Sequence, residues 1–545
     1  MISPRVHTAC EVFRDHRVTW HHRPLQLTCT CILLLLLASQ SQAAVSVNLP
    51  LDDPVYPLLE KLVTSNLTFT NALTIKPITR LYAARLIAEA MQQRRDELAT
   101  SQRQDPFLDW ILQYLAGRFK RELQQLRFFY RPRRPGPFFL APLSELKLDV
   151  AFASEQFVHR DSSGRTTNLQ GVFGLNEGFA YGNALSLRAR SISWGTVGEQ
   201  VAAYVEPDVR LRTDPILGDT FDTTLHKGYL KVGHMNLELE FGRDTLWWGP
   251  ASQGDLVLSN NAPPFDLLKL STPTPFRLPW LLSHLGEWQV AYFVTRLEAE
   301  QVIPHPLVSG LRVTVQPTAF LKFGFTNVIE AFGEGGENLS PLVFMEKLLV
   351  PTLDATAQSI NGLVAYDLVL SFPLARKITA LNGLKFYWQR GQDNVSHVQG
   401  FLGGGNILGG VLDGGRWDLR VEFAETRDHG AVWYTHPTYR SGFAFKQFLI
   451  GHPIGGAAES FFMRATYYWT PTAWIAADGR REQYGVDVQP DVTIQQRFGL
   501  EGSYQFSLQQ KHLVLWSRLE YATLDTPAVE PQHTFVLLFT ARWRF

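Results

Sequence analysis

The sequence has few cysteines, and all of them lie near its start. Cys10, Cys29 and Cys31 are the three cysteines in 545 residues. They precede Ala43, where a secretory leader would be cleaved, so the mature chain would contain none. This excludes structural disulfides, thiol catalysis and cysteine-ligated metal sites. It suits a protein that crosses an oxidising periplasm before folding.

The sequence also lacks a net charge and, after its start, long apolar runs. Its 51 Lys and Arg residues balance 51 Asp and Glu residues, which leaves no electrostatic footprint for nucleic acid. No mature segment approaches the roughly 18 consecutive apolar residues of a transmembrane helix. A transmembrane β-barrel remains allowed, because its strands alternate apolar and polar residues.

Catalytic signatures are missing as well. The sequence contains no nucleophile elbow, zinc-protease motif, phosphate-binding loop or paired cysteines. The glycines at 403–405 and 409–410 favour bends in strands over a phosphate loop, and the cluster Arg427 to His429 favours a solvated loop. We therefore predict no enzyme, no catalytic residue, no cofactor and no metal. A hydrolase would need residues that only folding brings together.

The first 43 residues are predicted to be a signal peptide. Basic residues up to Arg23 precede an apolar run from Cys31 to Ala38, and a small-x-small site ends at Ala43. The apolar run is too short to anchor the chain in a bilayer.

Residues 44–140 have the pattern of a periplasmic helical domain. Helix starts are indicated by Asp53-Pro54, Lys76-Pro77 and Asp105-Pro106, each followed by apolar residues at helical spacing. The domain ends in a Pro-rich linker with four arginines, Arg127, Arg131, Arg133 and Arg134. This linker is either solvated or in contact with an anionic polymer or lipid headgroup.

Residues 141–545 alternate apolar and polar residues in segments of about ten, bounded by Gly, Pro, Asn and Asp. The final segment alternates from Phe535 to the C-terminal Phe545, as bacterial outer-membrane barrels do. We predict a mainly β fold: an antiparallel transmembrane barrel of about 18 strands in the bacterial outer membrane. A monomer in contact with outer-membrane lipids is expected, inserted by the barrel-assembly machinery through the segment that ends at Phe545.

Counting connections back from Phe545, with both barrel ends in the periplasm, places the long ones outside. The connections predicted to lie outside span 524–532, 474–492, 426–438 and 329–359, whereas 507–511 is a short periplasmic turn. The same count places 245–264 on the outer or lumen side.

That last segment is the most unusual in the chain, reading GRDTLWWGPASQGDLVLSNNAPPFDLLKLS over residues 242–271. Adjacent tryptophans beside Gly249-Pro250 form a stiff apolar surface that either packs as a lumen plug or stacks on a sugar. The side chains predicted to bind polysaccharide or to fill the lumen are Trp247, Trp248, Asp255, Asn260, Asn261, Trp433 and Tyr434.

Two blocks of this sequence resemble the Wzi family of outer-membrane capsule-assembly proteins. The first has Arg243 and Asp244 at a strand end, then Trp-Trp with Gly249 and Pro250, then Ser-Asn-Asn-Ala-Pro-Pro to Pro264. The second is YRSGFAFKQFLIGHPIGG over 439–456, with Gly451, His452 and Pro453. Because His452 lies between Gly and Pro, a role as a hydrogen-bonded turn residue is favoured over a role as a ligand or base.

The resemblance implies a lectin-like function without chemistry, in which the outer face of the barrel holds capsular or exopolysaccharide at the cell surface. The alternative is a channel with an open lumen that exports polymer or passes small solutes. The sequence does not decide whether the lumen is plugged.

Overall fold

The computed structural model describes residues 44–70, 73–101, 105–128, 136–154, 159–160, 166–167, 175–179, 181, 184–213, 219–349, 359–372, 381–393, 404–428, 431–486, 492–508, 511–527 and 530–545. The predicted signal peptide, its three cysteines and the linker arginines Arg131, Arg133 and Arg134 lie outside these residues. Gly403 and His429 also lie outside them.

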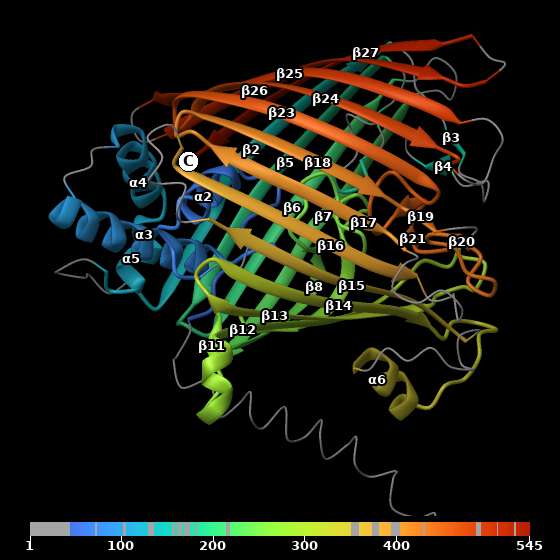
Figure 1. Cartoon of the computed structure of the whole chain (residues 1–545), viewed down its shortest axis with the longest axis horizontal. Coiled ribbons are helices and arrows are strands. Elements are labelled where there is room, and N and C mark those ends of the chain that lie inside the picture. The colour runs from blue at the N-terminus through green and yellow to red at the C-terminus, as the bar shows by residue number, and fades with distance from the viewer. Residues whose placement is uncertain are drawn as a thin grey trace, which may run out of the picture.

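Eighteen antiparallel strands close a barrel in which each strand pairs with the next and the last pairs with the first (Figure 1). They are β2 (Phe138–Ala153), β5 (Ala184–Val197), β6 (Val201–Arg212), β7 (Thr220–His234), β8 (Leu237–Asp244), β10 (Phe265–Ser271), β12 (Glu287–Arg296), β13 (Leu307–Thr318), β14 (Leu321–Ala331), β15 (Ile360–Ser371), β16 (Gly383–Asp393), β17 (Asn406–Asp413), β18 (Trp417–Glu425), β23 (Ala458–Thr470), β24 (Ala473–Tyr484), β25 (Thr493–Leu508), β26 (Lys511–Asp525) and β27 (Gln532–Arg544). The short β11 (Phe276–Arg277) adds to β12. The predicted fold class is confirmed.

The alternation along the strands sorts side chains between the outer wall and the lumen. In β27, Leu537 and Phe539 are exposed on the wall while Val536 and Leu538 are buried. This strand closes the barrel against β2, in a register that runs from Glu145 opposite Arg544 to Ala153 opposite Val536. An apolar outer face with period two is what a bilayer requires of a strand.

The two ends of the barrel differ. The helices α3 (Arg80–Ser101), α4 (Pro106–Arg118) and α5 (Lys120–Gln125) gather at one end, which we call the helix end (Figure 1). The four longest connections, 154–183, 245–264, 332–359 and 426–457, all leave from the opposite end, the loop end. The connection at 332–359 contains α6 (Pro341–Leu349). Which end faces the cell exterior stays a prediction from parity.

Local sequence signals explain where the N-terminal helices begin. The Asp105 side chain accepts a hydrogen bond of 3.1 Å from the backbone N–H of Leu108, with Pro106 in the first turn of α4. The Asp53 side chain likewise accepts a hydrogen bond of 2.9 Å from the N–H of Val55 at the start of α2 (Val55–Thr64). No helix formed by the described residues is both long and apolar enough to cross a membrane.

The division of the chain at residues 43 and 140 stays a prediction, but residues 44–80 do not form a body apart from the barrel. The apolar side of α2 packs into one core with α3 and α4, and this core includes Tyr468 of the barrel wall. The polar groups of the same segment reach the inward side chains of the strands, as described below.

Candidate functional site

The connection 245–264, which we call the tryptophan segment, turns back into the lumen and pairs with the N-terminal segment. Its strand β9 (Trp247–Trp248) is antiparallel to β1 (Ile75–Lys76), with Trp248 opposite Ile75. The N–H of Gly249 donates to the carbonyl oxygen of Thr74 at 2.9 Å. The lumen therefore holds a small sheet made from two distant parts of the chain.

The two tryptophans are packed between this sheet and the barrel wall. Trp248 is fully buried, and its ring lies 5.2 Å edge-on from the ring of Phe293 on β12. Trp247 is 7% exposed, and the ammonium of Lys76 lies 4.9 Å from its ring centroid. Such contacts favour a packed core over a free sugar platform.

The backbone at Gly249 lies so close to the Asp255 carboxyl that only glycine fits at position 249. Gly249 has φ +146°, and a Cβ there would clash with the Asp255 carboxyl. That carboxyl is completely buried and accepts a hydrogen bond of 3.2 Å from the N–H of Ala251. Burial raises the pKa of Asp255 to about 8, against the lowering effect of Lys76 and Arg312.

A second connection, 426–457, packs against the tryptophan segment, and we call it the hairpin segment. It contains β19 (Arg427–Asp428), β20 (Ala431–Val432), β21 (Ala444–Phe445) and β22 (Phe448–Leu449). Ser259 of the tryptophan segment donates its hydroxyl to the carbonyl oxygen of Gly451 at 2.6 Å, and its N–H to Ile450 at 2.9 Å. The Asn261 amide donates to the Leu449 carbonyl at 3.0 Å.

Tyr434 makes a further cross-link between the two segments. Its hydroxyl donates to the carbonyl oxygen of Leu256 at 2.6 Å and accepts from the N–H of His452 at 2.7 Å. Burial lowers the pKa of His452 to about 3, so its imidazole is neutral. Its Nδ1 accepts from the N–H of Ile454 at 3.3 Å, the geometry expected of a turn residue.

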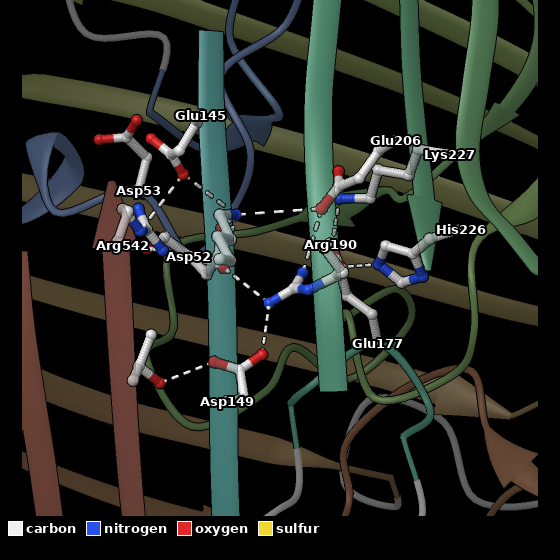
Figure 2. Close-up of polar contacts among 12 residues, drawn as sticks. Asp52, Asp53, Glu145, Asp149, Glu177, Arg190, Glu206, His226, Lys227 and Arg542 are labelled. Atoms are coloured by element: carbon white, nitrogen blue, oxygen red, sulfur yellow. Dashed lines mark hydrogen bonds and ion pairs between the residues drawn. The ribbon is translucent and has the colours of Figure 1, made fainter. Parts of the chain in front are cut away.

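The N-terminal segment is held to the wall by ion pairs on both sides of the seam between the last and first strands. Asp52 lies 3.0 Å from Lys147 of β2, 3.4 Å from Arg190 of β5 and 3.1 Å from Arg542 of β27. Figure 2 shows Arg190 reaching from Asp52 to Asp149 and Glu206, both at 3.2 Å. One carboxylate thus serves three strands.

Further ion pairs fasten α2 to the opposite part of the wall. Glu60 lies 2.8 Å from Lys385 and also pairs with Arg420, and the cations hold the pKa of Glu60 well below its usual range although burial opposes them. Lys61 lies 2.9 Å from Asp413. Charges buried inside a barrel persist when each has a partner.

The loop-end connection before β5 contributes a third inserted segment. Glu177 pairs with His226 at 2.6 Å and with Lys227, two neighbours on β7 (Figure 2). Its N–H donates to the carbonyl oxygen of Asn260 at 2.8 Å. The tryptophan segment is therefore supported on this flank as well.

The inserted segments leave part of the lumen empty. A cavity of about 540 Å³ lies between Leu51–Glu60, the tryptophan segment and the inward faces of β25, β26 and β27. Its wall includes Trp474, Trp516 and Arg464. An adjoining cavity of about 230 Å³ lies against Lys61 and Asp418.

The side chains predicted to bind polysaccharide are all buried in this plug. They are Trp247, Trp248, Asp255, Asn260, Asn261, Trp433 and Tyr434. Trp247 and Asn260 also line the cavity of about 540 Å³, and the other five are buried within the plug. Of the two roles predicted from the sequence, the burial of these residues fits the lumen plug, and sugar contact by them stays a prediction.

The predicted family-motif residues fall into three places. Asp244 is buried and accepts a hydrogen bond of 2.7 Å from the Asn48 amide. Arg243 is more exposed and forms an ion pair with Asp266 at 2.7 Å. The motif residues inside the plug or at its edge are Gly249, Pro250, Pro264, Gly451, His452 and Pro453.

The polar residues that hold the N-terminal segment in the lumen were not predicted from the sequence. Asn48, Asp52, Glu60 and Lys61 contact strand residues that are between 95 and 360 positions away. Four polar residues close to amphipathic helices carry no local sign of such partners. The missed signal was indirect: many predicted strands carried inward charges that needed counterions.

The closed barrel with its apolar wall and segments folded into its lumen defines this protein as an outer-membrane β-barrel of the bacterial type with an internal plug. Residues 155–534 match the family model described as capsule assembly protein Wzi. The chain belongs to the Wzi family of capsule assembly proteins.

The similarity to one solved structure extends over most of the chain and shows the same fold. The chain is similar to Wzi of Escherichia coli, an outer membrane protein involved in group 1 capsule assembly and a carbohydrate-binding β-barrel, with 17% identity, a TM-score of 0.64 and coverage of 92% of this chain and 100% of that chain. OprD of Pseudomonas aeruginosa has 12% identity and a TM-score of 0.42, with coverage of 74% of this chain and 94% of that one.

A curated relative is an uncharacterised 55.8 kDa protein in the cps region of Klebsiella pneumoniae. It is 28% identical over 110 residues, or 20% of this chain. The chain spans about a fifth (21%) of the length of this relative.

Proposed function

We propose that this protein binds capsular or exopolysaccharide at the cell surface and holds it there without chemical change. Its family assembles capsules, and the similar E. coli barrel binds carbohydrate. We also expect a monomer, inserted by the barrel-assembly machinery through the strand that ends at Phe545, with the loop end outside the cell.

The observation that carries this proposal is the docking of the tryptophan segment against the hairpin segment. Ser259 and Asn261 bond to the backbone at Gly451 and Leu449, so two connections fill the loop-end part of the lumen together. A barrel filled in this way suits a protein that retains a polymer at its rim better than one that conducts solutes.

Because the aromatic side chains are buried, we place the polymer contact on the exposed tip of the hairpin segment. Lys446 and Gln447 form this tip, and both have positive φ, as two-residue hairpin turns require. The N–H of Lys446 donates to Glu298 at 2.7 Å, which fixes the tip beside the next connection. Arg440 is exposed on the same segment, and the exposed Arg296 at the end of β12 pairs with Glu334 at 3.7 Å. These cations would attract an acidic polysaccharide.

The experiment compares polymer binding by the refolded protein with that of Lys446→Ala/Arg440→Ala. We expect purified acidic capsular polysaccharide to bind the parent and to bind the double variant more weakly, with a reduced dependence on salt. Lys511→Ala, a matched change at the exposed helix end, should bind like the parent. Absence of polymer binding by the parent would contradict the proposal.

The cavity of about 540 Å³ favours a second candidate, a channel for polymer or small solutes. Its walls carry charged side chains that could line an aqueous path. Conductance of single molecules in planar bilayers separates the two functions. A large steady conductance together with no polymer binding would identify the channel, whereas negligible conductance with polymer binding would identify the surface lectin.

A further inference from the structure

One short helix outside the barrel exposes apolar side chains that do not pack into the interior of the molecule. The 3-10 helix η1 (Trp280–Leu285) contains no buried residue. Trp280 is 89% exposed and Leu281 is 83% exposed, and Leu282 and Leu285 are also exposed. Neighbouring exposed apolar residues of this kind mark a contact surface, because water disfavours them.

The helix is fixed to the barrel on both sides and does not hang loosely. Before it, Thr274 donates its hydroxyl to Asn236 at 2.6 Å, and the Asn236 amide donates to the Thr274 carbonyl at 2.7 Å. After it, Gly286 turns the chain into β12 with φ +86°, so close to Gln316 of β13 that a Cβ would clash. The fold therefore holds these apolar side chains in place.

The position of η1 indicates what covers it. It leaves the barrel at the helix end, between β11 and β12, and in Figure 1 it is the yellow-green helix that extends downward from the wall below the β11 label. Two exposed apolar side chains lie on adjoining elements: Leu270 on β10, and Phe320 in the turn after β13. The exposed surface of η1 is thus continuous with the lipid-facing wall.

A ring of aromatic side chains marks the same level around the barrel. Exposed aromatic residues occur where strands begin or end at the helix end: Phe320, Trp417, Trp469, Phe506, Trp543 and Phe545. Aromatic girdles of this kind lie at the boundary between hydrocarbon and headgroups. Trp280 extends this girdle outward from the wall.

We propose that η1 is an interfacial anchor that inserts Trp280 and Leu281 into the lipid leaflet at the helix end. A short exposed helix that carries Trp and Leu together with polar residues such as Ser283 and His284 suits the headgroup boundary. The anchor fixes the depth and tilt of the barrel beside its wall at β12 and β13. This inference does not depend on polysaccharide binding or on which end faces outside.

The test places a nitroxide spin label at Leu281→Cys in a background in which Cys10, Cys29 and Cys31 are replaced by Ala. The protein is reconstituted into vesicles of phosphatidylethanolamine and phosphatidylglycerol. Collisions of the label with oxygen, which concentrates in the bilayer, are compared with collisions with a water-soluble nickel chelate. Leu519→Cys on the outer wall of β26 gives the lipid reference, and Leu98→Cys on α3 gives the water reference; both positions are exposed.

We expect the oxygen-to-nickel ratio at position 281 to shift away from that at position 98 and towards that at position 519. Trp280→Cys provides a second labelled site if the first variant does not fold. A ratio equal to that at position 98 would overturn the proposal. Loss of both collision types, with spin–spin broadening that grows with protein density, would also overturn it and would identify a second copy of the chain as the occupant.

Discussion

The Ser259 hydroxyl donates a 2.6 Å hydrogen bond to the carbonyl oxygen of Gly451, a residue 192 positions later in the chain. The chain between them includes eight strands of the barrel wall, β10 and β12 to β18. This bond joins the tryptophan segment to the hairpin segment, the two blocks in which the family resemblance is concentrated. Closure of the lumen therefore depends on both segments together, and changes in either should loosen the plug.

Tyr434→Phe should loosen this docking. The variant leaves the Leu256 carbonyl and the His452 N–H without their buried partner, which costs about 1–3 kcal/mol. We expect a lower urea midpoint for the plug and a higher single-channel conductance. Tyr467→Phe on the exposed outer wall should change neither property. Equal conductance for the Tyr434 variant and the parent would show that the hydroxyl does not hold the plug.

Gly249→Ala should displace the tryptophan segment. The added methyl group would meet the Asp255 carboxyl at a backbone φ of +146°, so we expect a loss of more than about 1 kcal/mol in stability. Gly335→Ala is a matched control, since it also has positive φ but lies in open space. Thermal unfolding followed by near-UV circular dichroism measures both. A similar loss in the two variants would assign the effect to backbone strain alone.

Asp255→Asn should change how the stability of the plug depends on pH. Burial raises the pKa of Asp255 to about 8, so the folded state keeps a proton that an unfolded carboxyl releases near about pH 4. Stability from this group therefore falls as the pH rises to 8. His452, with its pKa lowered to about 3, opposes this fall only up to a pH of about 6.5, the ordinary pKa of histidine.

The net fall should thus be seen between about pH 6.5 and 8, with a size of up to about 2 kcal/mol. Urea unfolding of the parent and of Asp255→Asn at a series of pH values measures it. The difference between the two proteins isolates the contribution of this one carboxyl. If the variant loses stability over this range as steeply as the parent, the buried carboxyl is not the group that titrates.

Asp52→Asn should weaken the barrel at its seam. The change removes one counter-charge that Lys147, Arg190 and Arg542 share, while each cation keeps another carboxylate partner. The loss should therefore be that of charge-assisted hydrogen bonds, about 1.5–3 kcal/mol. We expect a lower temperature for the loss of the folded, heat-modifiable form on gel electrophoresis. Asp109→Asn, which breaks the half-exposed pair with Arg94, should cost less than about 1 kcal/mol. A similar loss for both variants would contradict a special role for the seam.

The sequence was sufficient to predict the barrel, because the cause of that fold is repeated in every strand. A bilayer requires apolar residues at every second position, and the alternation from Phe535 to Phe545 satisfies this requirement with no reference to other parts of the chain. Helix starts at Asp53 and Asp105 were also predicted, since a capping carboxylate acts on backbone groups two or three residues away.

The candidate site was predicted only as a set of residues. The sequence singled out Trp247, Trp248, Asp255 and Tyr434 as plug or sugar contact, and left the choice open. Their burial depends on contacts with Ile75, Phe293 and Leu256, none of which a local pattern reveals. Because these contacts come from distant parts of the chain, the sequence around a tryptophan does not show whether its ring packs in a core or binds a sugar.

The sequence by itself determined the class of fold, the strand-forming segments and the family, because each follows from local periodicity or from a short motif. Only the tertiary structure decided that inserted segments occupy part of the lumen and that Asp52, Glu60 and Lys61 hold the N-terminal segment inside it. The physical reason is that a buried charge is stable only beside its counter-charge, and strand order, not sequence proximity, brings the two together.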